Sequence, residues 1–423
     1  MKVKIAKNLL MDVLEKMHSG ATKSLLPDFN FTGRISINAQ KTGVQFTTSN
    51  GFIIVNCNLS DLDDPNIKNC EPGSCTVDAI KFRDSVKNIT TDTPVIPIEL
   101  FDDGKTLSIR DTISKRKKIV KLPRESQIHA SDKVKRPDGE SFFFETEHFV
   151  KGIKTVAPFR CPVTYDPKNQ VILFHWKGKE TRLICGDGSV FAVFSFPRNS
   201  NDKSKAATER TLLSDQALVI AGLVGDSKTV EMVWKDKDVL WIKANNVEML
   251  VRGQPDVDYM QYETHAYRAE EAMACLEIKI DDLSEVSALL GVLRDKEREE
   301  EGSKCHSCFL EAPSDTDVVK FEITADQGRF QCEYEVPGKY FDLNNYPQHR
   351  ASYAHLWLGS IAHVIRHPYL RFYFIGEKTV NVRDADLGDP DQNGIPVVKD
   401  EPDGCSLSFF FASMRENVEE EEG

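Results

Sequence analysis

The segment from Thr211 to Gly253 is the unit that this chain repeats, and it limits the possible folds more than any other feature. Ser214 and Asp215 are residues that commonly cap the start of a helix, and Gly225 stands where a helix usually ends. Three runs rich in β-branched and large apolar residues follow, joined by short polar turns typical of hairpins. The runs are Val230–Lys235, Val239–Ala244 and Val247–Arg252. We therefore expect one helix followed by an antiparallel meander of strands.

This helix–meander pattern recurs six times along the chain. In the first copy, Leu10, Val13, Leu14 and Met17 repeat with the period of a helix. The helices expected in the other copies are Val77–Ile89, Thr146–Val156, Ser214–Val224, Asp282–Arg294 and Tyr353–Ile365. Leading strands before the helix are expected in two copies, at Phe142–Phe144 and Leu276–Ile280. The segments expected to be loops or linkers are Leu59–Gly73, Arg124–Glu140, Asp295–Ser307 and Asp384–Gly404.

Six copies pair naturally into three domains, each with two helices packed on antiparallel sheets. The expected fold class is therefore α+β, with three tandem domains and about three strands in each copy. The boundaries that follow are 1–128, 140–263 and 272–416, with an acidic tail at 417–423. An open solenoid is the alternative architecture, but its repeats are typically shorter and more uniform than these.

The average composition excludes several functions and compartments. The 423 residues include 54 Lys and Arg against 66 Asp and Glu, a net charge of −12, so a surface that binds nucleic acid has to be local. No run of 18 apolar residues occurs, and Asp12 and Glu15 in the first apolar stretch argue against a signal peptide. Ten cysteines without a regular spacing are typical of a reducing compartment. We expect a cytoplasmic protein with no membrane partner.

Candidate catalytic and metal-binding groups are few. Cys305 and Cys308 form a single CxxC motif, with no second pair at the spacing of a zinc site. His363 and His367 are four residues apart but lack the Glu of a zincin motif. No nucleophile elbow, P-loop or GxGxxG motif occurs. The sequence favours a protein that is not an enzyme and has no cofactor or metal. A zinc- or thiol-dependent enzyme that uses the CxxC motif is the alternative.

Four short motifs resemble those of a known family. Lys23–Pro27 resembles an Arg-Pro-Thr-Leu-Pro turn, and Cys185–Val193 resembles a Thr-Asp-Gly-His-Arg-Leu-Ala-Val stretch. Val257–Tyr259 resembles a Pro-Asp-Tyr segment, and Phe410–Arg415 resembles a closing Met-Pro-Met-Arg. No single motif is specific, but their order and spacing are, and they span nearly the whole chain. Together with the six copies, they make the chain resemble the bacterial sliding clamp, the β subunit of DNA polymerase III holoenzyme.

The chain departs from the family pattern in the region that grips partner peptides. The family's His-Arg pair is Ser189 and Val190 here, and the Pro of the closing motif is Ser413. The chain also continues for eight residues beyond Arg415. Such divergence would suit a bacteriophage or a distant bacterial lineage, and it implies a changed choice of partner peptide.

The resemblance implies a head-to-tail homodimer, a ring whose twelve helices line a hole for duplex DNA. Lys and Arg side chains that contact phosphates give affinity without sequence information and permit sliding, while the closed ring retains the protein on DNA. The residues expected to face DNA are Lys16, Lys23, Lys81, Arg83, Lys87, Lys151, Lys154, Arg160 and Arg366. The alternative is that these are ordinary solvated helix faces. The helix at Ser214–Val224 favours that alternative, because it carries no basic residue.

The resemblance also implies a shallow apolar pocket between the second and third domains. Short peptides of the replicative polymerase and the clamp loader would bind there through a few anchor side chains. Its expected lining is Gly186, Gly188, Val190, Phe191, Val257, Trp357, Phe411, Ala412, Ser413 and Met414. The alternative for Phe409–Phe411 is a buried strand, which holds for alternate residues because successive side chains point to opposite faces. The interface between the two chains of the dimer is expected at Ile119, Val292 and Leu293. The resemblance also implies that the protein belongs to the replisome.

Overall fold

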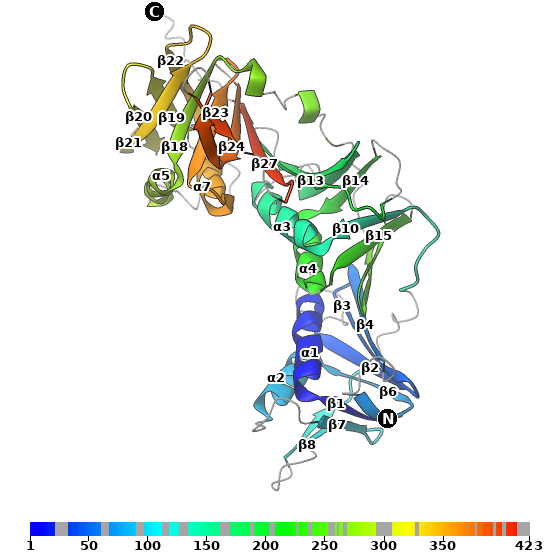
Figure 1. Ribbon diagram of the computed structural model, residues 1–423. Helices are drawn as coiled ribbons and strands as arrows, with labels where there is room; N and C mark the ends of the chain where they lie inside the picture. Colours follow the sequence, from blue (N-terminus) through cyan, green and yellow to red (C-terminus); the bar gives the residue numbers. More distant parts are fainter. Residues whose placement is uncertain are drawn as a thin grey trace, which may run out of the picture. The chain divides into compact units, whose positions relative to one another are not determined.

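The computed structural model divides into two compact units (Figure 1). The first unit contains residues 1–150, 199–204 and 215–256, and the second contains residues 151–198, 205–214 and 257–423. The residues that the structure describes are 1–21, 33–60, 67–89, 97–111, 118–126, 134–160, 170–186, 190–202, 208–225, 227–235, 239–252, 259, 262–264, 269–292, 307–325, 330–376, 379–391, 395–399 and 403–412.

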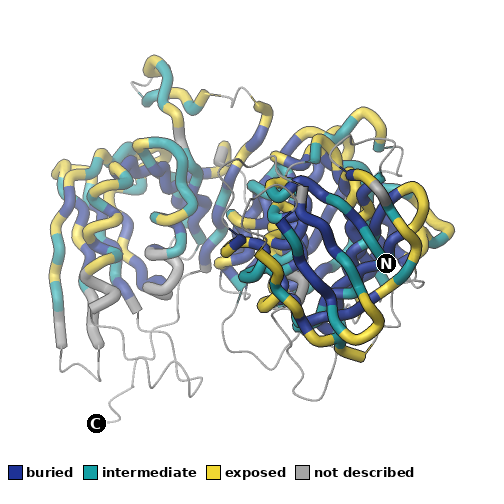
Figure 2. Tube along the Cα trace, turned by 90° about the horizontal axis from the view of Figure 1, so that it is seen from below, coloured by how far each residue is buried: buried dark blue, intermediate teal, exposed yellow. Residues whose placement is uncertain are grey.

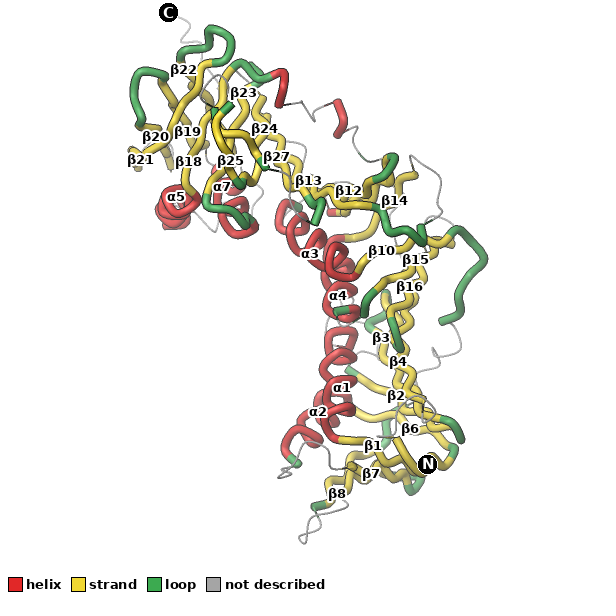
Figure 3. Tube along the Cα trace, viewed as in Figure 1, coloured by secondary structure: helices red, strands yellow, loops and turns green. Residues whose placement is uncertain are grey.

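The elements follow the helix–meander pattern, with a leading strand before the helix in every copy (Figure 3). The helices of the six copies are α1 (Lys7–Ala21), α2 (Ala79–Asn88), α3 (Thr146–Val156), α4 (Ser214–Val224), α5 (Ile280–Val292) and α7 (His355–Val364). Helices α3 and α4 have the predicted bounds, and the others differ from prediction by two residues or fewer where bounds were predicted. In the described part of the chain, no helix is long and apolar enough to cross a membrane.

The first unit contains two antiparallel sheets. The five-stranded sheet has the order β5-β1-β7-β8-β9, and the eight-stranded sheet has the order β10-β15-β16-β17-β4-β3-β2-β6. The strands of the smaller sheet are β1 (Lys2–Ala6), β5 (Ile67–Glu71), β7 (Pro97–Asp102), β8 (Thr106–Asp111) and β9 (Ile119–Pro123). Those of the larger sheet are β2 (Arg34–Gln40), β3 (Gly43–Ser49), β4 (Ile53–Ser60), β6 (Gly73–Asp78), β10 (Ser141–Glu145), β15 (Thr229–Lys235), β16 (Val239–Ala244) and β17 (Val247–Arg252).

The second unit contains a twelve-stranded sheet with the order β14-β11-β12-β13-β27-β24-β23-β18-β21-β20-β19-β22. Its strands are β11 (Val171–Lys177), β12 (Glu180–Gly186), β13 (Val190–Pro197), β14 (Thr208–Leu213), β18 (Ala274–Lys279), β19 (Ser307–Pro313), β20 (Val318–Ala325), β21 (Phe330–Asp342), β22 (Gln348–Ala354), β23 (Tyr369–Phe374), β24 (Thr379–Ala385) and β27 (Ser406–Ala412). A separate two-stranded sheet is formed by β25 (Leu387–Pro390) and β26 (Pro396–Val398).

Consecutive copies exchange their leading strands. Strand β1 of the first copy pairs with β7 of the second, and β6 of the second copy pairs with β2 of the first. The same exchange joins β10 to β15 and β14 to β11, and then β18 to β23 and β22 to β19. Because the backbone of each leading strand forms hydrogen bonds with a strand of the neighbouring copy, the copies are joined in pairs.

The structure corrects four predictions about strands. Each copy has a leading strand as well as its meander, so the expectation of about three strands per copy is wrong. The predicted loop Leu59–Gly73 contains β5, and the predicted loop Asp384–Gly404 contains β25 and β26. Strand β19 begins at Ser307, the last residue of the predicted loop Asp295–Ser307. Strands β6, β14 and β22 end their sheets, and an edge strand shows a weaker apolar pattern than a central one.

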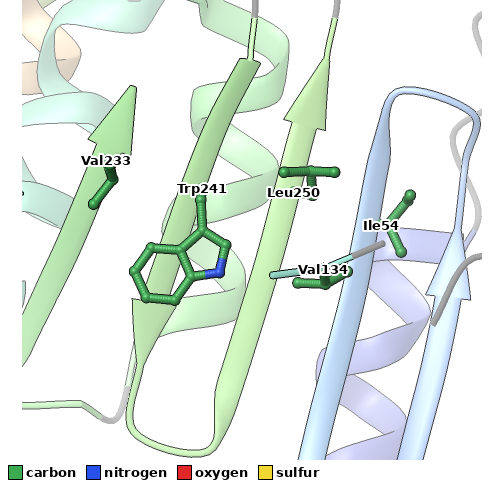
Figure 4. Close-up of a cluster of buried hydrophobic side chains, with 5 residues drawn as sticks. All are labelled: Ile54, Val134, Val233, Trp241 and Leu250. Carbon is green, nitrogen blue, oxygen red and sulfur yellow. The ribbon is translucent and has the colours of Figure 1, made fainter. Parts of the chain in front are cut away.

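The segment before β10 packs on the larger sheet of the first unit. Val134, in the predicted linker, is 6% exposed and lies in a cluster with Ile54, Trp241 and Leu250 on neighbouring strands (Figure 4). The Arg136 guanidinium lies 5.9 Å from the Trp241 ring centre, and its Nε is 3.3 Å from a Glu231 oxygen. The linker therefore covers the sheet where β4 meets β17. The domain boundaries near residues 128, 140, 263 and 272 stay predictions.

Buried residues run along the strands, and exposed residues gather at the turns (Figure 2). One buried polar group in the second unit is His349, which is 0% exposed and stacks on Phe374 with ring centres 3.8 Å apart. Its Nε2 lies 2.7 Å from the Tyr353 hydroxyl, and its Nδ1 lies 3.1 Å from the Tyr346 hydroxyl. Burial lowers the pKa of His349 to about 4, so the imidazole is neutral at pH 7.

We predict that His349 makes the second unit less stable in mild acid. An unfolded histidine has a pKa near 6.5, so between about pH 6.5 and 4 the unfolded chain binds a proton that the folded chain does not. Stability is then complete above pH 6.5 and falls by about 2 kcal/mol at pH 5. Denaturant unfolding at pH 7 and pH 5 measures this loss. It should shrink in His349→Gln, and an equal loss in the variant would assign the acid sensitivity to other groups.

Candidate functional site

Four of the predicted DNA-facing residues lie on α1 and α2, which pack side by side in the first unit (Figure 3). Lys81 and Lys87 are exposed on α2, whose buried face is formed by Ala79, Phe82 and Val86. Lys16 and Arg83 are half-buried and already paired. The Lys16 ammonium lies 2.9 Å from Asp12, and the Arg83 guanidinium lies 2.9 Å from Asp84 and 4.0 Å from Glu15. Lys81 and Lys87 are therefore less neutralised by nearby carboxylates than Lys16 and Arg83 are.

Sequence reasoning missed a cation that joins these two helices. The Lys7 ammonium, at the start of α1, donates to the Ile89 carbonyl at 2.5 Å and to the Lys87 carbonyl at 3.2 Å. The carbonyls at the end of a helix lack partners within the helix and carry partial negative charge. Lys7 thus acts as a C-terminal cap of α2 and helps to orient the helix that carries Lys81 and Lys87.

Four other predicted residues lie in the second unit, around α3 and the loop after α7. Lys154 is exposed, Arg160 follows the short 3-10 helix Ala157–Phe159, and Lys151 lies 2.9 Å from Asp403. The Arg366 guanidinium lies 5.7 Å from the Phe194 ring centre and 3.5 Å from Asp384.

Glycine at position 152 brings α3 close to the sheet. A Cβ there would lie 2.7 Å from both a Leu183 methyl and a Phe194 ring carbon, which is closer than side chains pack. The glycine is unfavourable within a helix by about 1 kcal/mol relative to alanine, and this close approach explains why it is there. The glycine therefore determines how far Lys151 and Lys154 lie from the sheet.

Basic residues are unevenly distributed over the six helices. In the described part of the chain, α1, α2 and α3 contain Lys or Arg, whereas α4, α5 and α7 contain none. Helix α5 carries Asp281, Asp282 and Glu285 instead. A contact with phosphates along the helices would therefore be concentrated on α2 and α3.

The described part of the predicted peptide pocket lies where β13 pairs with β27. Val190 lies opposite Phe411, and Phe191 lies opposite Phe410. Directly opposite residues point to the same face, and neighbours along a strand point to opposite faces. Val190 and Phe191 therefore serve different faces of the sheet, although both belong to the predicted lining. Gly186 lies opposite Phe191, and a Cβ there would come within 2.0 Å of the Val190 carbonyl oxygen.

Both faces are largely buried, and Phe410 is the more exposed ring at the junction. Phe409 and Phe411 lie on one face, where Phe409 packs on Phe159 and Phe411 packs edge-on against Tyr353. On the other face, Phe191 belongs to an apolar cluster to which the half-buried Phe410 adds its ring. That cluster is Leu173, Ile184, Phe191, Val193 and Tyr262, with Tyr259 and Phe410 packed against it. The predicted lining includes Phe411 and not Phe410, and the strand register places these two residues on opposite faces.

A polar group borders this apolar cluster. The Tyr262 hydroxyl lies 2.7 Å from His175 Nδ1 and accepts a hydrogen bond from Arg182 at 3.4 Å. Burial lowers the pKa of His175 and raises the pKa of Tyr262 to about 12, so both are neutral at pH 7. Glu263 accepts a hydrogen bond from Lys177, and this contact lowers its pKa. The cluster therefore has one apolar side and one charged side.

The other predicted site residues are only partly described. Six of them lie outside the described residues: Lys23, Gly188, Val257, Ser413, Met414 and Leu293. For three more, only the backbone is described: Trp357 in α7, Ala412 in β27 and Val292 at the end of α5. Ile119 is 49% exposed on β9, the last strand of its sheet. An edge strand with an exposed apolar side chain can pair with another chain.

The described half of the CxxC motif is unsuited to metal binding or catalysis. Cys308 is buried in β19, and burial raises the pKa of its thiol to about 12. A thiolate is the form that binds zinc or attacks a substrate, so this thiol is inert at neutral pH. Cys305 lies outside the described residues. His363 is exposed, and His367 Nδ1 lies 3.1 Å from Asp384.

No protein-family model and no curated protein sequence matches this chain. Solved structures do match. DNA polymerase III subunit beta from Pseudomonas aeruginosa has a TM-score of 0.75 at 15% identity, covering 98% of this chain and 100% of that one. The beta subunit from Thermotoga maritima has a TM-score of 0.74 at 11% identity, and the DNA polymerase sliding clamp from Bacillus subtilis has 0.74 at 14%, each covering 98% of this chain and 99% of its own. The chain has the sliding-clamp fold, as its sequence predicted.

Proposed function

We propose that the protein is a DNA sliding clamp, a processivity factor that encircles duplex DNA and tethers a replicative polymerase. The observation that carries this proposal is the match to sliding clamps over 98% of the chain. The fold by itself does not specify function, so the proposal also draws on the exposed cations of α2 and α3 and on the apolar cluster at the β13–β27 junction. The zinc- or thiol-dependent enzyme is not favoured, because Cys308 is a buried thiol.

A closed ring reconciles DNA binding with a net charge of −12. A closed ring stays on DNA because it surrounds the duplex, so only weak contacts with the DNA are needed. Contacts from Lys and Arg to phosphates carry no sequence information. The residues proposed to face DNA are the predicted set: Lys16 on α1, Lys81, Arg83 and Lys87 on α2, Lys151 and Lys154 on α3, and Lys23, Arg160 and Arg366 outside the helices. The duplex would be free to slide because these contacts are few and interchangeable.

The ring itself is proposed to be a head-to-tail dimer, with Ile119 on β9 of one chain meeting Val292 and Leu293 of the other. A heterologous joint of this kind closes into a ring when the rotation permits. We predict that Val292→Ala/Leu293→Ala lowers the solution mass from two chains to one at low micromolar concentration, measured by light scattering. It should also abolish retention on circular duplex.

The control for the joint is Val397→Ala, which removes an exposed apolar side chain from β26. This variant should keep the mass of two chains. If the double variant keeps that mass as well, the joint lies elsewhere in the chain.

The DNA contact predicts an ionic-strength effect. Replacing Lys81 and Lys87 by Gln removes two exposed cations from α2, so the salt slope for binding to a short linear duplex should fall by about two. Fluorescence anisotropy over a salt series measures the slope. Lys235→Gln/Lys243→Gln makes the same charge change on strands β15 and β16 and should leave the slope unchanged. Equal slopes in both double variants would place the duplex away from α2.

The peptide site is proposed on the face that carries Phe191 and Phe410. A short peptide with a Gln and bulky apolar residues, as the resemblance implies, would bury its anchors against these rings. We predict that Phe410→Ala weakens peptide binding at least tenfold and lowers the melting temperature little, because Phe410 is half-buried. Phe409→Ala, in the same strand but 0% exposed, should destabilise the fold by about 3–5 kcal/mol. Calorimetry with such a peptide decides, and an unchanged affinity in Phe410→Ala would exclude this face.

A further inference from the structure

The segment Asp384–Gly404 contains seven acidic residues and one lysine, and both of its ends contact cations that are proposed to face DNA. Near its carboxyl end, the Asp403 carboxylate lies 2.9 Å from the Lys151 ammonium of α3. At its amino end, the Asp384 carboxylate lies 3.5 Å from the Arg366 guanidinium. Lys151 and Asp403 are 252 residues apart in sequence, Arg366 and Asp384 are 18 apart, and all four belong to the second unit.

The two carboxylates have different structural roles. The Asp384 side chain is 2% exposed and accepts hydrogen bonds from the backbone N–H groups of Arg366 and His367, each at 3.1 Å. Asp384 lies in β24 and holds the turn between α7 and β23 through these bonds, so removing its charge would disturb that turn. The Asp403 side chain is 35% exposed, so the Lys151–Asp403 pair is open to solvent and to other ions.

Asp403 is held in place as an anion. Its Oδ1 accepts a hydrogen bond from the Cys405 backbone N–H at 2.9 Å, while its Oδ2 faces Lys151. Partial burial opposes ionisation, but Lys151 and the Cys405 N–H outweigh it and lower the pKa of Asp403. A carboxylate fixed in front of a lysine occupies the place that a phosphate oxygen would take.

We propose that the acidic segment is an intramolecular competitor for duplex DNA, in which Asp403 occupies Lys151 until a phosphate displaces it. This inference rests on the proposed clamp function. A partly exposed ion pair of this kind is weak, so a phosphate can exchange with the carboxylate readily. The competition weakens each encounter with the duplex without removing the cation, which keeps a protein retained by topology free to slide.

The competition has a measurable signature. Asp403→Asn frees Lys151 but keeps an amide oxygen that can accept the hydrogen bond from Cys405. The variant should therefore bind a short linear duplex a few-fold more tightly, and its salt slope should rise by about one because one more cation contacts a phosphate. Fluorescence anisotropy across a salt series measures both quantities, with the melting temperature as a check on folding.

Two controls separate local competition from net charge. Asp389→Asn makes the same charge change at an exposed position on β25 and should leave affinity and slope near those of the parent. In a Lys151→Gln background, Asp403→Asn should have no effect, because the cation that it frees is gone. The proposal is overturned if Asp403→Asn and Asp389→Asn act alike, or if the effect of Asp403→Asn persists without Lys151.

The same series tests the proposed function separately. If Lys81→Gln/Lys87→Gln and Lys151→Gln both leave duplex binding unchanged, the helices do not face DNA and the clamp proposal itself fails. If those variants weaken binding while Asp403→Asn changes nothing, the clamp proposal stands and the competition is refuted.

Discussion

The exchange of leading strands is the constraint on which the rest of the structure depends. Strands β1 and β6 each pair with the meander of the other copy, and four further strands repeat the exchange. In an isolated copy, both edges of the three-stranded meander would be unpaired, and the leading strand pairs one of them. The hydrogen bonds between strands join backbone groups. They constrain the side chains little, beyond an alternation of apolar and polar residues along each strand. That explains how the fold persists at 11–15% identity to its structural neighbours.

The sequence predicted the helices and meanders well because both signals are local. Helix α3 carries its apolar stripe within one segment, and the central strands β16 and β17 are apolar runs with a turn between them. The edge strands were harder to predict. Strand β14, with the sequence TERTLL, buries one residue, and β25 and β26 pair only with each other. Their conformation is set by a partner strand elsewhere in the chain, which local periodicity does not show.

The candidate sites show the same division. The family motifs predicted a peptide site at the β13–β27 junction, and the proposal of Phe410 instead of Phe411 comes from the register that places Phe191 opposite Phe410. The cations on the helices were identified from the sequence, yet their partners were not. Asp403 lies 252 residues after Lys151, and no spacing rule connects the two. Charge compensation across such a distance is a property of the folded chain, and it decides which cations remain available.

A clamp has to hold its cations near DNA without fixing them to it. In the proposed clamp, the described helices would meet this requirement to different degrees. Lys81 and Lys87 are exposed, Lys16 and Lys151 are each 2.9 Å from a carboxylate, and α5 presents only acids. Partly exposed ion pairs exchange partners at little free-energy cost, so a paired lysine would still contribute to the proposed electrostatic attraction of the duplex. A chain with more cations on its helices would bind phosphates more tightly but move along them more slowly. The acidic residues beside the helices are therefore as much a part of the proposed DNA surface as the lysines.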